Sequence, residues 1–171
     1  YGTKYLIDEI IKQKKNIKWF FFSSSSHVYK MKRNKINETS PTIPSSNYGK
    51  TKLLAENYIR NKLKKSKIIF CIGRIFSIYD NTGKDFLIPN LLKKINQKKK
   101  KLIFENLNHY RDFLSTLQIS EIITFLWKKK FQGIINIGSG SQINIKTIVK
   151  KLTSKSKKEL FFKKNKPTFL I

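Results

Sequence analysis

A tyrosine and a lysine four positions apart, Tyr48 and Lys52, follow a run of serines at 23–26 in this chain of 171 residues. Residues i and i+4 of a helix share a face, so a helix here would bring the phenol and the ammonium together. A free tyrosine is a poor base at neutral pH, but a nearby ammonium favours its phenolate, which can take a proton from a substrate hydroxyl. A serine hydroxyl at a strand end can hold the same oxygen. These residue types suit hydride transfer at a carbon bearing oxygen, with a nicotinamide carrying the hydride.

The Tyr-x-x-x-Lys spacing alone is a weak signal. It has only two fixed positions, and a chain with 37 lysines and arginines meets it by chance. The alternative is an exposed lysine beside a half-buried tyrosine, with no chemical role. The secondary structure predicted around Tyr48 and Lys52 is needed to choose between a catalytic pair and a pair without a chemical role.

Short apolar runs alternate with helical patterns along the chain. The runs at 17–22 (IKWFFF) and 67–76 (KIIFCIGRIF) are typical of strands buried on both faces, and further strands are predicted at 102–106 and 133–140. Helices are predicted at 3–15, 48–64, 86–97, 117–129 and 144–152, the last with Asn144 as N-cap, and a loop and a turn at 30–47 and 80–85. This alternation predicts an α/β fold with a doubly wound parallel sheet. Ligands bind such sheets beyond the carboxyl ends of the strands, where the serines lie.

The formal net charge of +27 invites a nucleic-acid hypothesis, which the composition weakens. Only four basic residues are arginine, the side chain that grips phosphate and base edges bidentately: Arg33, Arg60, Arg74 and Arg111. Lysine, isoleucine and asparagine are abundant and alanine occurs once, as expected when a genome drifts towards A and T. Either such drift or a selected polyanion-binding surface explains the charge. Because the composition fits drift and few of the basic residues are arginine, we do not expect nucleic acid as a partner.

One cysteine, Cys71, excludes an internal disulfide and a multi-cysteine metal site, and we predict no metal. The sequence contains no apolar stretch of membrane-span length and does not open on a signal peptide. We therefore expect a cytoplasmic chain without a membrane partner.

In order along the chain, several segments resemble the NAD-dependent epimerase/dehydratase family, the sugar-nucleotide branch of the extended short-chain dehydrogenase/reductase superfamily. The helix and strand that lead into SSSSHVY resemble those before the family's catalytic serine or threonine, and SSNYGKTKLLAE resembles its Tyr-x-x-x-Lys helix. The further matching segments are RIFSIYD, FLIPNLLKKI, RDFLSTLQISEII and GIINIGSGSQINIKTIV. The third of these departs from the family pattern, because Ser115–Gln118 lacks the two usual acids.

The resemblance implies a role for each matching residue. Tyr48 would be the catalytic acid/base, Lys52 would bind the nicotinamide ribose and tune Tyr48, and Ser25 would supply the catalytic hydroxyl. Ser23 would shape the strand end beside the cofactor, with Phe76 nearby.

Two further residues would face the substrate by the same resemblance. Arg111 would grip the substrate diphosphate, as suits a guanidinium, although a surface salt bridge with Asp112 is the alternative. Ser77 stands where the family often has asparagine. The lone histidines, His27 and His109, are interpreted as structural or solvent-exposed rather than catalytic.

The resemblance also implies NAD or NADP as cofactor, bound through Gly-x-x-Gly-x-x-Gly after the first strand. The seven glycines, at 2, 49, 73, 83, 133, 138 and 140, include no such spacing. We therefore interpret the chain as an internal fragment, from a truncated, split or degraded gene. On this interpretation residues 1–80 are the later half of a Rossmann-like cofactor domain whose N-terminal half is missing. Residues 81–171 are mostly a small α/β substrate-binding region, with 115–140 returning to the Rossmann-like sheet.

The hypothesis from sequence is an NAD(P)-dependent sugar-nucleotide epimerase, dehydratase or reductase acting on a nucleoside-diphosphate sugar through a transient keto sugar. It would be a homodimer at full length, and this fragment would be inactive alone. Ser26 and His27 replace the acidic pair that commonly follows the catalytic hydroxyl in family dehydratases, which favours an epimerase or a reductase. The alternatives are a non-catalytic, lysine-rich polyanion-binding protein and an inert gene remnant.

Overall fold

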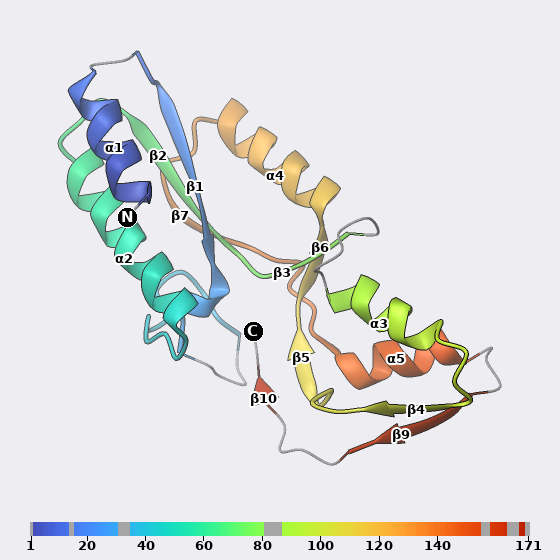
Figure 1. The fold of residues 1–171 in the computed structure, drawn as a ribbon. Coiled ribbons are helices and arrows are strands. Elements are labelled where there is room, and N and C mark those ends of the chain that lie inside the picture. Colours follow the sequence, from blue (N-terminus) through green and yellow to red (C-terminus); the bar gives the residue numbers. More distant parts are fainter. Residues whose placement is uncertain are drawn as a thin grey trace. The chain divides into compact units, whose positions relative to one another are not determined.

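A computed structural model describes residues 2–13, 16–30, 35–80, 87–154, 158–163 and 168–169 (Figure 1). The chain divides into two compact units. Unit 1 comprises Tyr1–Phe76 and Ile119–Ile137, and unit 2 comprises Ser77–Gln118 and Gly138–Ile171.

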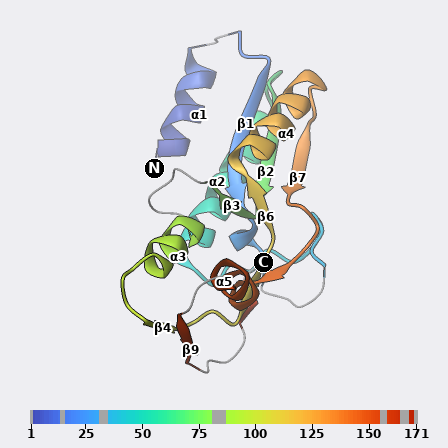
Figure 2. The same cartoon turned by 90° about the vertical axis from the view of Figure 1, so that its right-hand side faces the viewer.

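Unit 1 is built on a three-stranded sheet in the order β1-β2-β7, with both strand pairs parallel. Its strands are β1 (Trp19–Ser25), β2 (Ile69–Ile75) and β7 (Gly133–Ile137). Helices α1 (Gly2–Lys12) and α2 (Asn47–Leu63) cover one face of this sheet, and α4 (Thr116–Lys128) covers the other (Figures 1 and 2). A 3-10 turn, η1 (Ser26–Val28), follows β1 directly.

The core of unit 1 lies between the sheet and the two helices α1 and α2. Ile7, Ile59, Leu63 and Ile72 are almost fully buried there, and the partly buried aromatic residues of β1 and β2 pack against them. Burial of such side chains contributes about 1.5–3 kcal/mol each to the free energy of unfolding. This packing holds the carboxyl end of β1 in place beside α2.

Unit 2 consists of short strands and two helices. Its strands are β3 (Ser77–Tyr79), β4 (Lys101–Phe104), β5 (His109–Arg111), β6 (Phe113–Ser115), β8 (Ile143–Asn144), β9 (Glu159–Phe162) and β10 (Thr168–Phe169). Parallel pairs form between β3 and β6 and between β4 and β9, while β5 lies between β8 and β10. Helices α3 (Leu87–Ile95) and α5 (Ile145–Thr153) enclose a core with Phe104 and Leu102 of β4.

The expected parallel α/β architecture is confirmed, with differences at the ends of elements. The predicted 133–140 strand is β7, which ends at Ile137. Strand β1 runs to Ser25 rather than ending at 22, because Ser23–Ser25 continue the ladder against β2. The described part of the 3–15 helix ends at Lys12, with residues 14–15 outside the described part of the chain. Most of the 80–85 turn, residues 81–85, also lies outside it, as does residue 86 at the start of the predicted 86–97 helix. Six of the described strands in unit 2 have four residues or fewer and were not predicted: β3, β5, β6, β8, β9 and β10.

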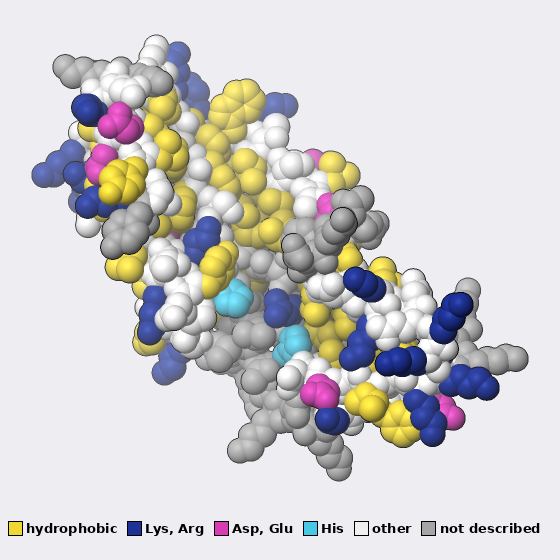
Figure 3. Space-filling view, in the orientation of Figure 1, with side chains coloured by type: hydrophobic (Ala, Val, Ile, Leu, Met, Phe, Trp, Pro, Cys, Tyr) yellow, Lys and Arg dark blue, Asp and Glu magenta, His cyan; other side chains and the backbone are white. Residues whose placement is uncertain are grey.

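Lysine and arginine side chains are scattered over the face of the molecule shown in Figure 3, and apolar side chains lie between them. Within the described ranges, no helix is long and apolar enough to span a bilayer.

Candidate active site

The serine run occupies the carboxyl end of β1. Ser24, Ser25 and Ser26 are buried, while the side chain of Ser23 is exposed. The Ser25 hydroxyl oxygen accepts a hydrogen bond of 3.3 Å from the backbone N–H of His27, which caps the η1 turn. The candidate catalytic hydroxyl is therefore held by the backbone that follows it.

Helix α2 begins beside this strand end. The hydroxyl oxygen of Ser46 accepts a 3.0 Å hydrogen bond from the backbone N–H of Gly49, a typical N-cap, so Tyr48 lies in the first turn. The Tyr48 side chain is 53% exposed, and its ring meets that of His27 edge to face, with centroids 5.6 Å apart. The candidate acid/base is therefore open to a substrate.

Lys52 links helix α2 to strand β1. Its Nζ donates a 2.7 Å hydrogen bond to the backbone carbonyl of Ser23 and lies 5.7 Å from the centroid of the Tyr48 ring. Desolvation lowers the pKa of Lys52. The alternative without a chemical role predicted an exposed lysine beside a half-buried tyrosine. The structure shows the opposite, because Lys52 is half-buried and Tyr48 is exposed.

A buried ion pair that was not predicted from sequence lies behind these residues. Glu56, fully buried in α2, receives hydrogen bonds from Arg74 of β2, with Nε 3.0 Å from Oε1 and an NH2 nitrogen 2.6 Å from Oε2. The Ser24 hydroxyl also donates to Glu56, at 2.5 Å. One carboxylate thus joins α2, β2 and the serine end of β1.

The guanidinium of Arg74 has further partners in unit 1. It lies 4.7 Å from the centroid of the Tyr29 ring. Burial by itself lowers the pKa of Arg74, but its hydrogen bonds to Glu56 and Tyr29 outweigh that effect, so its pKa is raised. Tyr29 in turn donates a 2.7 Å hydrogen bond from its hydroxyl to Asn136 Oδ1 of β7.

Two sequence signals could have revealed this ion pair. Arg74 is the one charged residue in the apolar run IIFCIGRIF, and a charged residue is rarely buried without a partner. Glu56 stands four residues after Lys52, so it continues the helical face that carries Tyr48 and Lys52.

The remaining predicted site residues divide between the units. Phe76 follows β2 in unit 1, and its backbone N–H donates a 3.0 Å hydrogen bond to the carbonyl of Ile137. Ser77 begins β3 in unit 2 and is buried, with its N–H bonded to the carbonyl of Asp112 at 2.8 Å. Arg111 ends β5, where burial lowers the pKa of its guanidinium and its Nε is buried without a hydrogen-bond partner among the described residues.

Asp112 binds the backbone of the turn after β7 instead of pairing with Arg111. Its carboxylate accepts hydrogen bonds from the N–H of Ser139 at 2.7 Å, the hydroxyl of Ser139 at 2.6 Å and the N–H of Gly140 at 2.8 Å. Among the described residues, the ion pairs do not include one between Arg111 and Asp112.

The segment Ser115–Gln118, which lacks the two acids of the family pattern, forms the start of α4. The Gln118 side-chain oxygen accepts from the N–H of Ser115 at 2.9 Å, and the Ser115 hydroxyl accepts from the N–H of Gln118 at 3.1 Å. This is a capping box, for which Ser-x-x-Gln is the sequence signature. The departure from the family pattern therefore has a local structural role.

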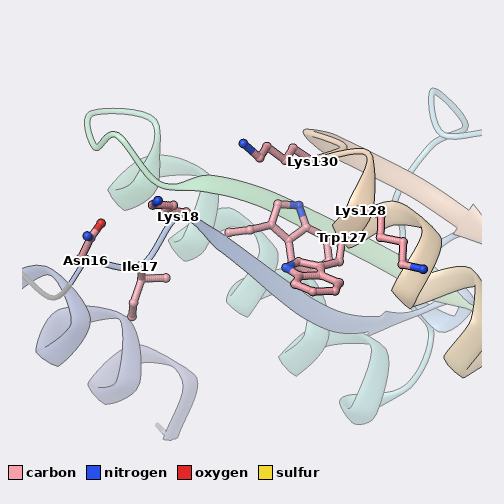
Figure 4. Close-up of a pocket in the computed structure, with 7 residues that line it drawn as sticks. Asn16, Ile17, Lys18, Trp127, Lys128 and Lys130 are labelled. Carbon is pink, nitrogen blue, oxygen red and sulfur yellow. The ribbon is translucent and has the colours of Figure 1, made fainter.

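A cavity of about 560 Å³ lies at the opposite end of β1, lined by residues at the start of that strand and the end of α4 (Figure 4). It contains Trp19 and Trp127, the only two tryptophans of the chain, with Lys18, Lys128 and Lys130 around them. Ser25 lies six positions after Trp19 along β1, about 20 Å away at 3.3 Å per residue. The cavity is therefore not part of the candidate active site.

The sequence contains only some of the residues that usually bind a dinucleotide. Lys52, whose ammonium is anchored to the Ser23 carbonyl beside the exposed Tyr48, is the residue that could hold the ribose next to a nicotinamide. No glycine-rich turn of the family spacing exists in the sequence to receive the pyrophosphate. The residues present fit one end of the cofactor.

A parallel sheet flanked by helices on both faces places this chain in the class of Rossmann-like α/β proteins. The chain belongs to the family described as GDP-mannose 4,6 dehydratase, which it matches over residues 1–168. The resemblance to NAD-dependent sugar-nucleotide epimerases and dehydratases is confirmed, and this is a family of enzymes.

Curated relatives are similar over most of this chain. It is 30% identical over 137 residues to an uncharacterised UDP-glucose epimerase of Bacillus subtilis (strain 168), covering 78% of this chain and 43% of the relative. It is 28% identical over 150 residues to a dTDP-4-dehydro-6-deoxyglucose reductase of Escherichia coli, covering 83% and 46%. The chain thus spans less than half the length of these relatives.

A solved structure of UDP-glucuronic acid 4-epimerase from Bacillus cereus, in complex with UDP-glucuronic acid and NAD, has a similar fold. The TM-score is 0.78 at 27% identity, over 98% of this chain and 55% of that one.

Proposed function

We propose that this chain carries the catalytic side chains of an NAD(P)-dependent sugar-nucleotide epimerase or reductase that acts on a nucleoside-diphosphate sugar. The observation that carries the proposal is the hydrogen bond from Lys52 Nζ to the Ser23 carbonyl, 2.7 Å long. It joins the Tyr-x-x-x-Lys helix to the serine end of β1, the two halves of the site predicted from sequence.

In this proposal Tyr48 removes the proton of a sugar hydroxyl, and Ser25 donates a hydrogen bond to the same oxygen. Lys52 stabilises the tyrosine in its anionic form and binds the nicotinamide ribose, with Ser23 and Phe76 beside it. A bound nicotinamide would supply the hydride acceptor and donor. In an epimerase, a transient keto sugar is the product of this first half-reaction. In a reductase, the keto sugar is the substrate, and Tyr48 donates a proton to its carbonyl oxygen as the hydride is transferred to the carbon.

The substrate diphosphate is assigned to unit 2, to Arg111, with Ser77 as a second substrate contact. A guanidinium binds phosphate oxygens through two parallel hydrogen bonds, and Arg111 has a buried nitrogen with no partner in the described structure. The absence of an ion pair with Asp112 supports this role.

The comparisons name dehydratases as well as epimerases and reductases, so the choice of an epimerase or a reductase rests on the sequence. The two curated relatives above are described as an epimerase and a reductase. Ser26 and His27 follow Ser25 where dehydratases of the family commonly have two acids. Assignment of unit 1 to cofactor binding and unit 2 to substrate binding, and dimerisation at full length, belong to the same proposal.

The reaction is tested with a longer polypeptide in which these 171 residues follow a segment carrying Gly-x-x-Gly-x-x-Gly. It is incubated with NAD or NADPH and a panel of UDP-, GDP- and dTDP-sugars, and the products are identified by NMR. Inversion at a carbinol carbon indicates an epimerase, and NADPH consumption with a 4-keto sugar indicates a reductase. Failure to convert any member of the panel would contradict the proposal.

A further inference from the structure

Two buried side-chain nitrogens on strand β5 have no hydrogen-bond partner within the described part of the chain. They are His109 Nε2 and Arg111 Nε. Residues i and i+2 of a strand point to the same face, about 7 Å apart along the strand, so both side chains leave β5 on one side. Two buried nitrogens without a partner among the described residues therefore lie on the same face of β5 in unit 2.

Such a pair calls for an explanation, because buried polar groups in folded proteins nearly always have a partner. Leaving a buried group unsatisfied costs about 1–3 kcal/mol, and more when the group is charged. The neighbouring carboxylate of Asp112 is not the partner of either nitrogen, since it accepts three hydrogen bonds from Ser139 and Gly140. For Arg111 Nε, which can only donate, the missing partner is a group that accepts hydrogen bonds.

His109 is bound to backbone through its other ring nitrogen. A hydrogen bond between the ring and the backbone of Asn106 raises the pKa of His109. Because Nε2 has no partner among the described residues, the ring nitrogen that donates this bond is Nδ1. In a neutral ring with its proton on Nδ1, Nε2 carries only a lone pair and cannot donate to an oxyanion. A protonated ring donates from both nitrogens.

The surroundings favour the neutral ring when no ligand is bound. Burial, and then the positive charge of Arg111, lower the pKa of His109, against the smaller opposing effect of the Asn106 backbone. Strand β8, which pairs with β5, contributes no titratable side chain, since it consists of Ile143 and Asn144. The buried face of α5, formed by Ile145, Val149 and Thr153, has none either.

We propose that His109 is a second anion-binding residue, which joins Arg111 on the phosphate oxygens of the ligand and takes up a proton as the anion binds. The identity of the anion as the diphosphate of a nucleotide sugar rests on the proposed function. The anion site itself rests on the two buried nitrogens.

The direction of the pH dependence follows from this geometry. A bound anion favours imidazolium, so the pKa of His109 is higher in the complex than in the free protein. Binding therefore takes up a proton, and affinity rises as the pH falls through the pKa of the complex, reaching a plateau below that of the free protein. Between the two values the gain approaches about tenfold per pH unit.

The test uses NMR of the histidine ring protons, of which the chain has two sets, from His27 and His109. The signals are assigned with His109→Gln, and their titration is followed without ligand, with sulfate and with UDP-glucose. The phosphates of UDP-glucose are diesters and do not titrate between about pH 5.5 and 7.5, so the histidine is the group that changes charge. We expect the His109 pKa to rise by about one unit with either anion.

Calorimetry with UDP-glucose over the same pH range supplies the second readout. Wild type is expected to bind about tenfold more tightly at the lower pH and to take up a proton. His109→Gln should lose both the proton uptake and the pH dependence, and Arg111→Gln should weaken binding at every pH. Lys150→Gln, which removes an exposed lysine of the same unit, is the control for net charge and should leave affinity within about twofold.

The outcomes separate the two proposals. If sulfate raises the His109 pKa but UDP-glucose does not bind, the anion site stands and the proposed substrate fails. If neither anion moves the His109 pKa, or if His109→Gln keeps the pH dependence of wild type while remaining folded, the inference is overturned.

Discussion

At the scale of single residues, the candidate site depends on close approach of backbone to backbone. Gly49 lies next to Tyr48 and is buried, and a Cβ at this position would lie 2.2 Å from the carbonyl oxygen of His27 and 2.9 Å from Cβ of Pro44. A glycine is required here by space, because it sits in an ordinary helix with no positive φ. The same approach lets the rings of His27 and Tyr48 touch.

Gly49→Ala should therefore destabilise unit 1 and separate His27 from Tyr48. We expect a loss of about 1–3 kcal/mol, typical of an added carbon in a full space. Urea unfolding followed by tryptophan fluorescence measures it, since both tryptophans belong to unit 1. The matched control is Gly2→Ala, where a Cβ meets nothing within 4 Å and α1 should be unchanged or slightly stabilised. Equal stability of the two variants would contradict this account.

At the scale of elements, one buried carboxylate ties a helix to two strands. Glu56 of α2 binds Arg74 of β2 and Ser24 of β1, and all three residues are at most 3% exposed. The ends of β1 and α2 that carry Ser25 and Lys52 are adjacent to this tie. It therefore fixes the spacing between the candidate hydroxyl and the candidate lysine.

Glu56→Gln removes the negative charge and leaves the guanidinium of Arg74 buried without a counter-ion. Breaking a buried pair in this way costs about 3–5 kcal/mol, so unit 1 should unfold at much lower urea concentration. Glu9→Gln serves as the control, because the Glu9 side chain is 51% exposed and should matter by less than about 0.5 kcal/mol. If Glu56→Gln were as stable as Glu9→Gln, the ion pair would have no structural importance.

The elements also show what a sequence can reveal. Helix α2 was predictable because Ser46 caps it, and the α5 start because Asn144 does. The end of β1 was placed too early, because serine has no strong strand preference and the ladder with β2 extends the strand. The two- and three-residue strands of unit 2 depend on partners distant in sequence, such as Arg111 with Ile143, so no local pattern announces them.

The candidate site was predictable only in part for a related reason. Tyr48, Lys52 and Ser25 stand in recognisable local patterns. The pair of Glu56 and Arg74 is 18 residues apart in sequence and joins different elements, and the unanswered nitrogen of His109 is visible only once its surroundings are packed. Burial, which decides the importance of both, is a property of the folded chain.

At the scale of the whole molecule, the chain carries the residues assigned to proton transfer and lacks the glycine-rich turn that receives a dinucleotide pyrophosphate. We therefore expect the 171-residue polypeptide to bind NAD with a Kd weaker than about 1 mM, because contacts at one ribose supply little of the required free energy. Calorimetry tests this, with the longer polypeptide as the positive control. Micromolar binding of NAD by the chain alone would show that another part of it replaces the glycine turn.

The high positive charge of the chain leads to a separate prediction, about which anions it binds. If the lysines were a selected polyanion surface, binding to single-stranded DNA would be tight at low salt, fall steeply with added salt and be indifferent to UDP-sugars. If they reflect base composition, sugar nucleotides should bind the anion site of unit 2 in competition with sulfate. The two titrations distinguish the alternatives without any assay of turnover.

The most direct test of the central claim is the turnover of Tyr48→Phe in the longer polypeptide that binds NAD. Phenylalanine keeps the ring beside His27 and removes only the hydroxyl assigned to proton transfer. We predict that kcat falls by about 10²–10⁴-fold, the range for loss of a general acid/base, while KM for the nucleotide sugar changes little. Turnover equal to wild type would contradict the assignment of Tyr48, and with it the proposed mechanism.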